Sequence, residues 1–271
     1  MSRRTVRGPA TALVLACVVA WAGSDATAWA QQPFVVDDAE VTAAGVPHVE
    51  ISTQIDSLKP AARPSRWQNV FETEVALGLP GRVEAAVLVP VISLVSQAGS
   101  ATRAVHGPGD SSLALKWRAT DDPRARVSWA GSAFLELPTG SARRGLGSAL
   151  IDYGVNLVSQ VLLTPHWTLR GNLGGVFAGN LQTGAVGITA RGGVVTGGTS
   201  LVRTLRRGQF GGELTGAWSP NVSLAGSALG AQLGGNVSLS SRVTLDGGLG
   251  AGWFAGSPAW SVQLGMSADL R

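Results

Sequence analysis

The chain has 271 residues, of which 21 are Lys or Arg and 17 are Asp or Glu. Only 14% of the residues are charged, against roughly 25% in soluble proteins, and the mean hydropathy is positive at +0.21, so the composition disfavours an ordinary soluble enzyme. Beyond the N-terminus no apolar run approaches the ~18 to 20 residues of a membrane-spanning helix, which excludes helical membrane proteins and leaves β-strands in a membrane as the favoured class.

The first thirty residues have the pattern of a secretory signal. Three arginines precede an uncharged run from Gly8 to Ser24, and the small-residue site Ala28-Trp29-Ala30 follows. We therefore predict a signal peptide over residues 1–30, cleaved near Ala30. The only cysteine, Cys17, lies within it, so the predicted mature chain has no disulfide, thiol nucleophile or cysteine metal ligand.

Residues 31–46 form the next predicted region, an irregular periplasmic segment. It is acidic at Asp37, Asp38 and Glu40 and shows no strand periodicity. Two alternatives stay open for it: the segment plugs the lumen of a barrel, or it is disordered.

Apolar residues recur at every second position over most of residues 47–271, which is the period of a strand with two unlike faces. Near the C-terminus, Trp260, Val262 and Leu264 alternate with polar residues. The pattern predicts an all-β fold, a transmembrane antiparallel up-and-down β-barrel. We place about twelve strands near 47–55, 66–79, 82–95, 110–119, 125–137, 149–162, 167–179, 187–202, 209–218, 225–239, 243–254 and 259–270.

The connections between these strands alternate between short and long. The short ones are 80–81, 120–124, 163–166, 240–242 and the somewhat longer 203–208; the long ones are 56–65, 96–109, 138–148, 180–186 and 219–224. Short turns at one rim and long loops at the other indicate an outer-membrane barrel with both termini in the periplasm, although the connection 255–258 is short against this rule. A soluble β-sandwich is the alternative, and the even strand count and alternating loops weigh against it.

The seven tryptophans after the signal lie near strand ends, where the two interfaces of a bilayer would be. We predict an aromatic girdle of Trp67, Trp218, Trp253 and Trp260 at the long-loop rim and Trp117, Trp129 and Trp167 at the short-turn rim.

The strand face opposite the apolar one would line the lumen and holds charges of both signs. The candidate lumen and selectivity residues are Glu72, Glu74, Glu84, Lys116, Arg118, Arg126, Glu136, Asp152, Arg170, Arg191, Glu213, Asp246 and Asp269. Either these charges pair across an interior filled by side chains, or they form a constriction that selects among solutes. Opposite charges on neighbouring walls predict weak discrimination between cations and anions, and hence uncharged or dipolar cargo.

The sequence contains none of the common motifs of catalytic, metal or cofactor sites. We find no G-x-S-x-G, H-E-x-x-H, phosphate-binding or dinucleotide-binding pattern, and His48, His106 and His166 are not spaced as metal ligands. The sequence therefore predicts no enzyme activity, no catalytic residue, no cofactor and no metal. The arginines are scattered singly, without a basic stripe, so no nucleic-acid partner is expected either.

Several segments resemble a family of outer-membrane barrels named for the MetA pathway of phenol degradation and assigned to transport. They are Leu77–Glu84, Val89–Val91, His106–Arg118, Leu135–Ser141, Gly145–Ser148 and Asp152–Leu157. The resemblance covers roughly residues 70–160. It implies a barrel that passes small, often hydrophobic or aromatic compounds, and it implies no catalytic residue. Barrels of this kind commonly end on an aromatic residue that the barrel-assembly machinery reads, whereas this chain ends Asp269-Leu270-Arg271.

The sequence as a whole predicts a protein of the bacterial outer membrane, a channel for small, uncharged or aromatic solutes. The alternative is a non-conducting structural or adhesive barrel that acts through its extracellular loops. Expected partners are outer-membrane lipids and lipopolysaccharide, whose phosphates Arg143 and Arg144 could contact, the barrel-assembly machinery and a small-molecule solute.

Overall fold

The computed structural model describes residues 33–60, 65–98, 100–122, 124–177, 192–221, 223–224 and 227–270. Within these ranges, no helix is long and apolar enough to cross a membrane. The predicted signal peptide and Arg191 lie outside the described residues.

The described residues form one antiparallel sheet of thirteen strands that closes on itself. The strands are β1 (Pro47–Ser57), β2 (Ser65–Leu79), β3 (Val83–Ala98), β4 (Ala101–Pro108), β5 (Ser111–Arg118), β6 (Val127–Leu137), β7 (Asp152–Thr164), β8 (Trp167–Phe177), β9 (Gly193–Leu205), β10 (Gly208–Trp218), β11 (Ala228–Ser238), β12 (Val243–Gly252) and β13 (Trp260–Asp269). Strand β1 pairs with both β2 and β13, so the first and last strands are joined.

The ring of the barrel has twelve positions, as the sequence predicted, because β4 and β5 share one of them. The first half of β3 pairs with β5 and the second half with β4. Between the two halves lies Pro90, which has no N–H to donate to a sheet and whose carbonyl accepts the Gly109 N–H at 3.0 Å. The predicted loop 96–109 is thus wrong in part, since residues 101–108 continue the sheet as a hairpin with β3.

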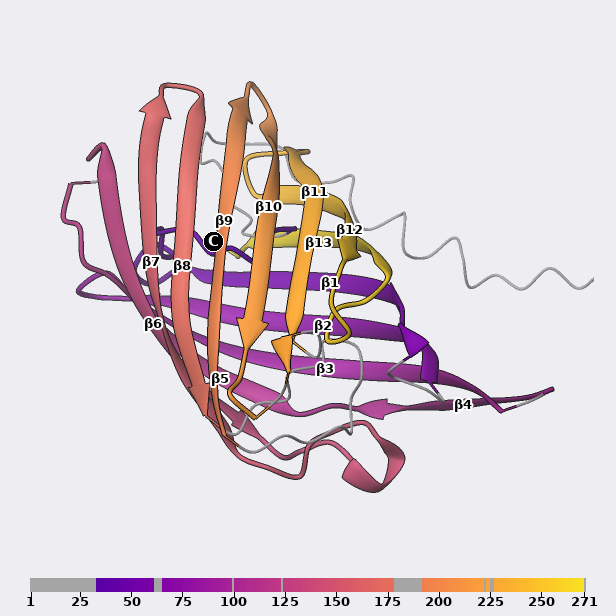
Figure 1. Ribbon diagram of the computed structural model, residues 1–271. Helices are drawn as coiled ribbons and strands as arrows, with labels where there is room; N and C mark the ends of the chain where they lie inside the picture. The colour runs from indigo at the N-terminus through magenta and orange to yellow at the C-terminus, as the bar shows by residue number, and fades with distance from the viewer. Residues whose placement is uncertain are drawn as a thin grey trace, which may run out of the picture.

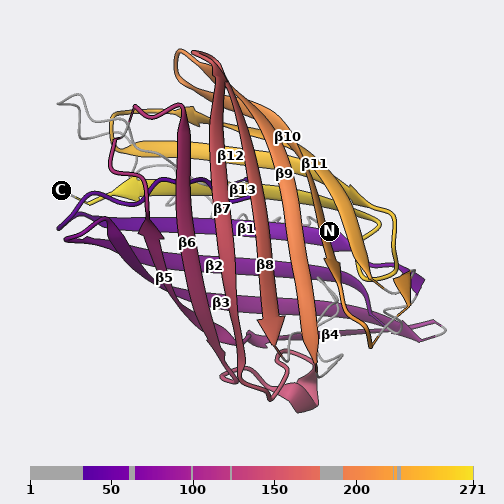
Figure 2. The ribbon, with the colours of Figure 1, turned by 60° about the vertical axis from the view of Figure 1, so that its left-hand side comes forward.

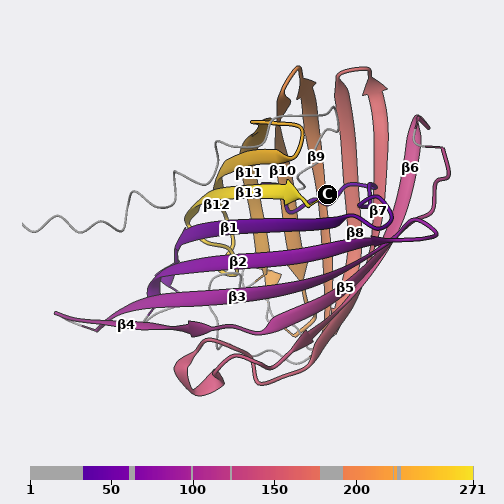
Figure 3. The ribbon, with the colours of Figure 1, turned by 180° about the vertical axis from the view of Figure 1, so that it is seen from behind.

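The strands of the wall are strongly tilted relative to the barrel axis (Figure 1). Strands β7 to β10 run nearly upright in this view while β1 to β3 pass across behind them, and the views in Figures 2 and 3 show the same wall from other sides. The β3–β4 hairpin extends beyond the rest of the long-loop end. At the other end the turns are short, and the predicted connection 203–208 is tighter than expected, because β9 continues to Leu205 and β10 begins at Gly208.

The two faces of the wall differ as the alternation predicted. Large apolar side chains such as Leu115, Leu157 and Leu249 point outward and are more than half exposed, whereas the alternate positions are polar, small or buried. Such an exterior suits lipid rather than water. The seven predicted girdle tryptophans all lie at outward positions at or beside strand ends, and Trp67 meets Trp260 edge to face with ring centroids 5.2 Å apart.

Candidate functional site

Residues 33–46, here called the plug, lie inside the barrel. They are irregular apart from an isolated bridge between Ala44 and Gly78 of β2. Phe34, Val36 and Ala39 are buried, and Ala39 packs against Ala130 of β6 and Val158 of β7. In the structure, residues 33–46 of this segment occupy part of the lumen, which is the first of the two alternatives that the sequence left open.

The acidic residues of the plug meet the basic residues of the lumen wall. Lys116 Nζ of β5 donates to Asp37 Oδ1 at 2.7 Å and lies 3.5 Å from Asp38. Arg170 of β8 lies 3.4 Å from Asp38, and Arg118 of β5 forms an ion pair with Glu40. These contacts use three wall cations that the sequence assigned to the lumen.

The charge state of Asp38 fits this arrangement. Burial alone would raise the pKa of its carboxyl, but the positive charges of Lys116 and Arg170 outweigh burial and lower the pKa below the ordinary value. Asp38 is therefore ionised at neutral pH and holds the plug to two strands at once.

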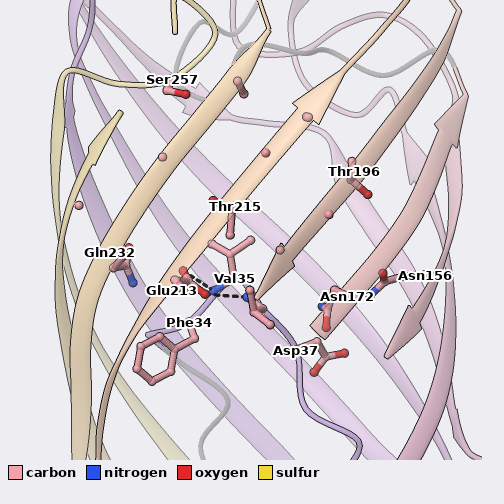
Figure 4. Close-up of a pocket in the computed structure, with 18 of the residues that line it drawn as sticks. Phe34, Val35, Asp37, Asn156, Asn172, Thr196, Glu213, Thr215, Gln232 and Ser257 are labelled. Atoms are coloured by element: carbon pink, nitrogen blue, oxygen red, sulfur yellow. Dashed lines mark hydrogen bonds between the residues drawn. The ribbon is translucent and has the colours of Figure 1, made fainter. Parts of the chain in front are cut away.

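Wall carboxylates hold the plug through its backbone. Glu213 of β10 accepts the N–H groups of Val35 and Val36 at 3.0 and 2.8 Å, the two dashed lines of Figure 4. Glu84 of β3 accepts the Thr42 N–H at 2.7 Å. A buried backbone N–H must find an acceptor, and an irregular segment inside a barrel finds it on the wall.

Glycines in the wall make room for the plug. A Cβ atom on Gly78 would lie 2.1 Å from the Ala43 carbonyl oxygen, and one on Gly198 would lie 2.7 Å from a Val36 methyl group. On Gly234 it would lie 2.6 Å from the ring of Pro33. The lumen glycines therefore allow the close approach of a second chain segment.

Beyond the plug, towards the long loops, the lumen opens into a cavity of about 660 Å³, here called the vestibule. Its floor is Phe34, Val35, Val36 and Asp37 of the plug (Figure 4). Its polar walls include Glu50, Gln54, Glu74, Asn156, Asn172, Thr196, Glu213, Thr215 and Gln232, and its apolar walls include Leu88, Phe134 and Val176.

The structure places most predicted lumen residues on inward positions of the wall. These are Glu72, Glu74, Glu84, Lys116, Arg118, Glu136, Asp152, Arg170, Glu213, Asp246 and Asp269. Arg126 is different: it lies in the connection before β6 and is exposed. Five of the inward residues contact the plug, namely Glu84, Lys116, Arg118, Arg170 and Glu213. Glu136 and Asp152 lie apart from the plug, near the long-loop rim.

Sequence reasoning missed the neutral amides of the vestibule. Asn156, Asn172 and Gln232 stand at inward positions, but only charged residues were considered as candidates for solute contact. Their alternation with apolar neighbours was the available signal, since an amide on the inward face of a narrow barrel must face the lumen.

Three of the segments that carry the family resemblance, His106–Arg118, Leu135–Ser141 and Gly145–Ser148, meet at the mouth of the barrel. Asp110, beside the start of β5, accepts the N–H of Gly140 at 2.8 Å and that of Ser148 at 2.6 Å. Leu146 is fully buried against Ile92 and Leu94 of β3. The long connection 138–151, with the short 3-10 helix η4 (Ala142–Arg144), is thereby fastened beside β4.

The barrel is similar in fold to solved outer-membrane channels. The COG4313 outer membrane channel from Pseudomonas putida F1 has a TM-score of 0.68 at 13% identity, with 86% of this chain and 98% of that chain covered. The NanC porin has a TM-score of 0.55 at 10% identity, with 83% and 100% covered. The KdgM porin, in complex with disordered oligogalacturonate, has a TM-score of 0.54 at 10% identity, with 83% and 99% covered.

No protein-family model and no curated protein matches the sequence. At 10 to 13% identity the structural likeness shows the fold alone: a closed antiparallel barrel of the outer-membrane kind. The resemblance to the phenol-degradation barrel family is supported as far as the fold and stays a prediction beyond it.

Proposed function

We propose that this protein is a channel of the bacterial outer membrane that passes small solutes, with the plug narrowing its lumen. The observation that carries the proposal is the vestibule, a cavity with both polar and apolar lining inside a closed barrel whose exterior is apolar. A cavity of about 660 Å³ lies within the range of small-molecule sites. The predicted signal peptide agrees with export to this location.

The solute class follows in part from the lining. Phe34 and Phe134 give the vestibule aromatic surface, which supports the predicted aromatic cargo. The expectation of an uncharged cargo assumed that basic and acidic residues share the open lumen. The plug changes this balance, because it pairs with Lys116, Arg118 and Arg170.

A second candidate function is the non-conducting structural or adhesive barrel. The plug itself favours it, since residues 33–46 occupy part of the lumen, and so does the ordered connection 138–151 at the mouth. Arg143 and Arg144 in that connection are exposed and would contact lipopolysaccharide phosphates. In this role the loops, and not the lumen, would meet the partner.

Conductance in planar bilayers separates the two functions. We expect the full mature chain to give small, discrete current steps, and a variant lacking residues 33–44 to give larger ones. Heat-modifiable gel mobility checks that both are folded barrels. A folded barrel that stays silent with and without the plug would overturn the channel proposal and favour the structural role.

A further inference from the structure

The charged residues that line the vestibule are all acidic. They are Asp37, Glu50, Glu74 and Glu213, and no Lys, Arg or His is found among the lining residues of the described chain. The lumen wall does contain basic residues, but Lys116, Arg118 and Arg170 are buried against Asp37, Asp38 and Glu40 of the plug. The plug thus removes the wall cations from the solute path.

The acidic wall continues from the vestibule across neighbouring strands. Strand register places Glu50 of β1 opposite Glu74 of β2, and Ser52 of β1 opposite Glu72 of β2. Carboxylates on adjacent strands repel each other, which costs free energy unless a positive charge lies between them. His48 Nε2 lies 3.1 Å from Glu50 Oε1 and offsets this cost for Glu50, whereas no ion pair is found for Glu72 or Glu74 in the described structure.

Asp246 of β12 is a further buried carboxylate of the lumen wall. It is only 8% exposed, and neither of its carboxylate oxygens has a hydrogen-bond partner in the described structure. Its carboxylate leans over Gly265 of β13, where a Cβ atom would lie 2.5 Å away, and Gly265 is paired with Ser52 of β1. The carboxylate therefore points across β13 towards the acidic wall. Asp246 does not itself line the vestibule. A buried carboxylate without a donor is costly, and a cation that passes along the lumen would relieve that cost.

The remaining lining suits the body of an organic cation. Phe34 on the floor and Phe134 on the wall offer aromatic rings, which attract ammonium and guanidinium groups. Asn156, Asn172 and Gln232 offer amide oxygens that accept N–H donors (Figure 4).

We propose that the vestibule selects small organic cations, solutes with an ammonium or guanidinium group on an apolar body. The inference deepens the proposed channel function and rests on it for transport, whereas binding in the vestibule does not require conduction. Acidic walls of one sign in a narrow, low-dielectric tube concentrate cations and repel anions.

The first test measures ion selectivity of the full mature chain in planar bilayers across a potassium chloride gradient. We expect a several-fold permeability preference for potassium over chloride. The double variant Glu50→Gln/Glu74→Gln should bring the ratio close to one. Because Glu50 also contacts His48 at the junction of β1 and β13, heat-modifiable gel mobility checks that this variant is a folded barrel. The matched control Asp121→Asn/Asp122→Asn, which removes two charges from the periplasmic connection, should leave it unchanged.

A second variant tests the part played by the plug. Asp37→Asn/Asp38→Asn removes the negative charges that face Lys116 and Arg170, so the permeability ratio should move towards anions. An anion-selective or unselective wild-type channel would overturn the proposal, as would a ratio that responds equally to the vestibule variant and to its control.

The third test needs no conduction. Calorimetry of the folded barrel with benzylammonium, benzyl alcohol and benzoate compares a cation, a neutral isostere and an anion. We expect benzylammonium to bind at least several-fold more tightly than the other two, with the difference lost in Glu50→Gln/Glu74→Gln. Preferential cation binding by a barrel that does not conduct would contradict the channel function but support the cation site. Equal binding of the three probes would contradict the cation site.

Discussion

His48 in β1 and Asp269 in β13 are joined side chain to side chain, with 2.7 Å between Nδ1 and Oδ1, although 221 positions separate them. The other ring nitrogen of His48 lies 3.1 Å from Glu50 Oε1. Both His48 and Glu50 are buried. The three residues therefore fasten the seam where the first and last strands close the barrel.

Replacing His48 by Ala should weaken this seam. The variant leaves Glu50 and Asp269 close together without the bridging imidazole, and breaking a buried pair of this kind costs on the order of 3 kcal/mol. We expect the folded band in heat-modifiability gels to be lost at a lower temperature. The control is His166→Ala in an exposed short turn, which should behave as wild type. Equal melting of the two variants would show that the seam contacts contribute nothing.

A disulfide should form between the plug and the wall. A Cβ atom on Gly248 would lie 3.3 Å from the Pro33 Cβ, close to the separation found in disulfides. Because the predicted mature chain has no cysteine, Pro33→Cys/Gly248→Cys contains one possible pair. We expect it to oxidise within the barrel, and conductance to be higher after reduction than before it. Each single-cysteine variant is the control. A cysteine pair that stays reduced under oxidant would contradict the position of Pro33 beside Gly248.

Acid should loosen the plug through Asp38. When the plug lies in the lumen, the pKa of Asp38 is lowered below its ordinary value of 3.8. The ion pairs to Lys116 and Arg170 therefore stabilise the plug in the lumen at pH values above 3.8, and they are lost as the pH falls through the lowered pKa. We expect Asp38→Asn to raise the mean conductance at pH 7. As the pH falls below about 4, the contribution of Asp38 to the plug contacts should weaken in the wild type, whose conductance then moves towards that of the variant. A wild type and a variant that differ by the same factor at pH 7 and pH 3 would contradict this role of Asp38.

Asp110→Ala should release the connection 138–151. The substitution leaves the N–H groups of Gly140 and Ser148 without their acceptor, at a cost of about 1 to 3 kcal/mol for such buried groups. Trypsin should then cut after Arg143 or Arg144 faster than in the wild type. Ser112→Ala, two positions further on in β5, is the control. A cleavage rate equal to that of the control would show that the connection is held by other contacts, such as those of Leu146.

The barrel wall is the part of the molecule that could be predicted best from the sequence. All twelve ring positions were predicted near their observed places, because the alternation of Leu169, Leu173 and their polar neighbours is a local property of each strand. The largest error lies where the pairing partner of β3 changes. The loop 96–109 was expected to lack strands, since nothing in the sequence says that β3 is long enough to exchange β5 for β4 at Pro90.

The candidate site was predicted less completely. Lys116, Arg118 and Arg170 were assigned to the lumen by alternation, and residues 31–46 were noted as acidic. Their pairing could not be predicted, because Asp37 and Lys116 are 79 positions apart and no local pattern links them. In the proposed channel, the charge along the solute path depends on this pairing.

The sequence by itself determined which face of each strand meets lipid and which meets the lumen, because a β-strand alternates its side chains whatever lies around it. Only the tertiary structure decided what the lumen contains. Whether Glu213 faces open solvent or accepts the Val35 N–H, 178 positions away, depends on where a chain segment without secondary structure comes to rest. That position is set by the combined contacts of many strands, to which each strand contributes only one or two residues.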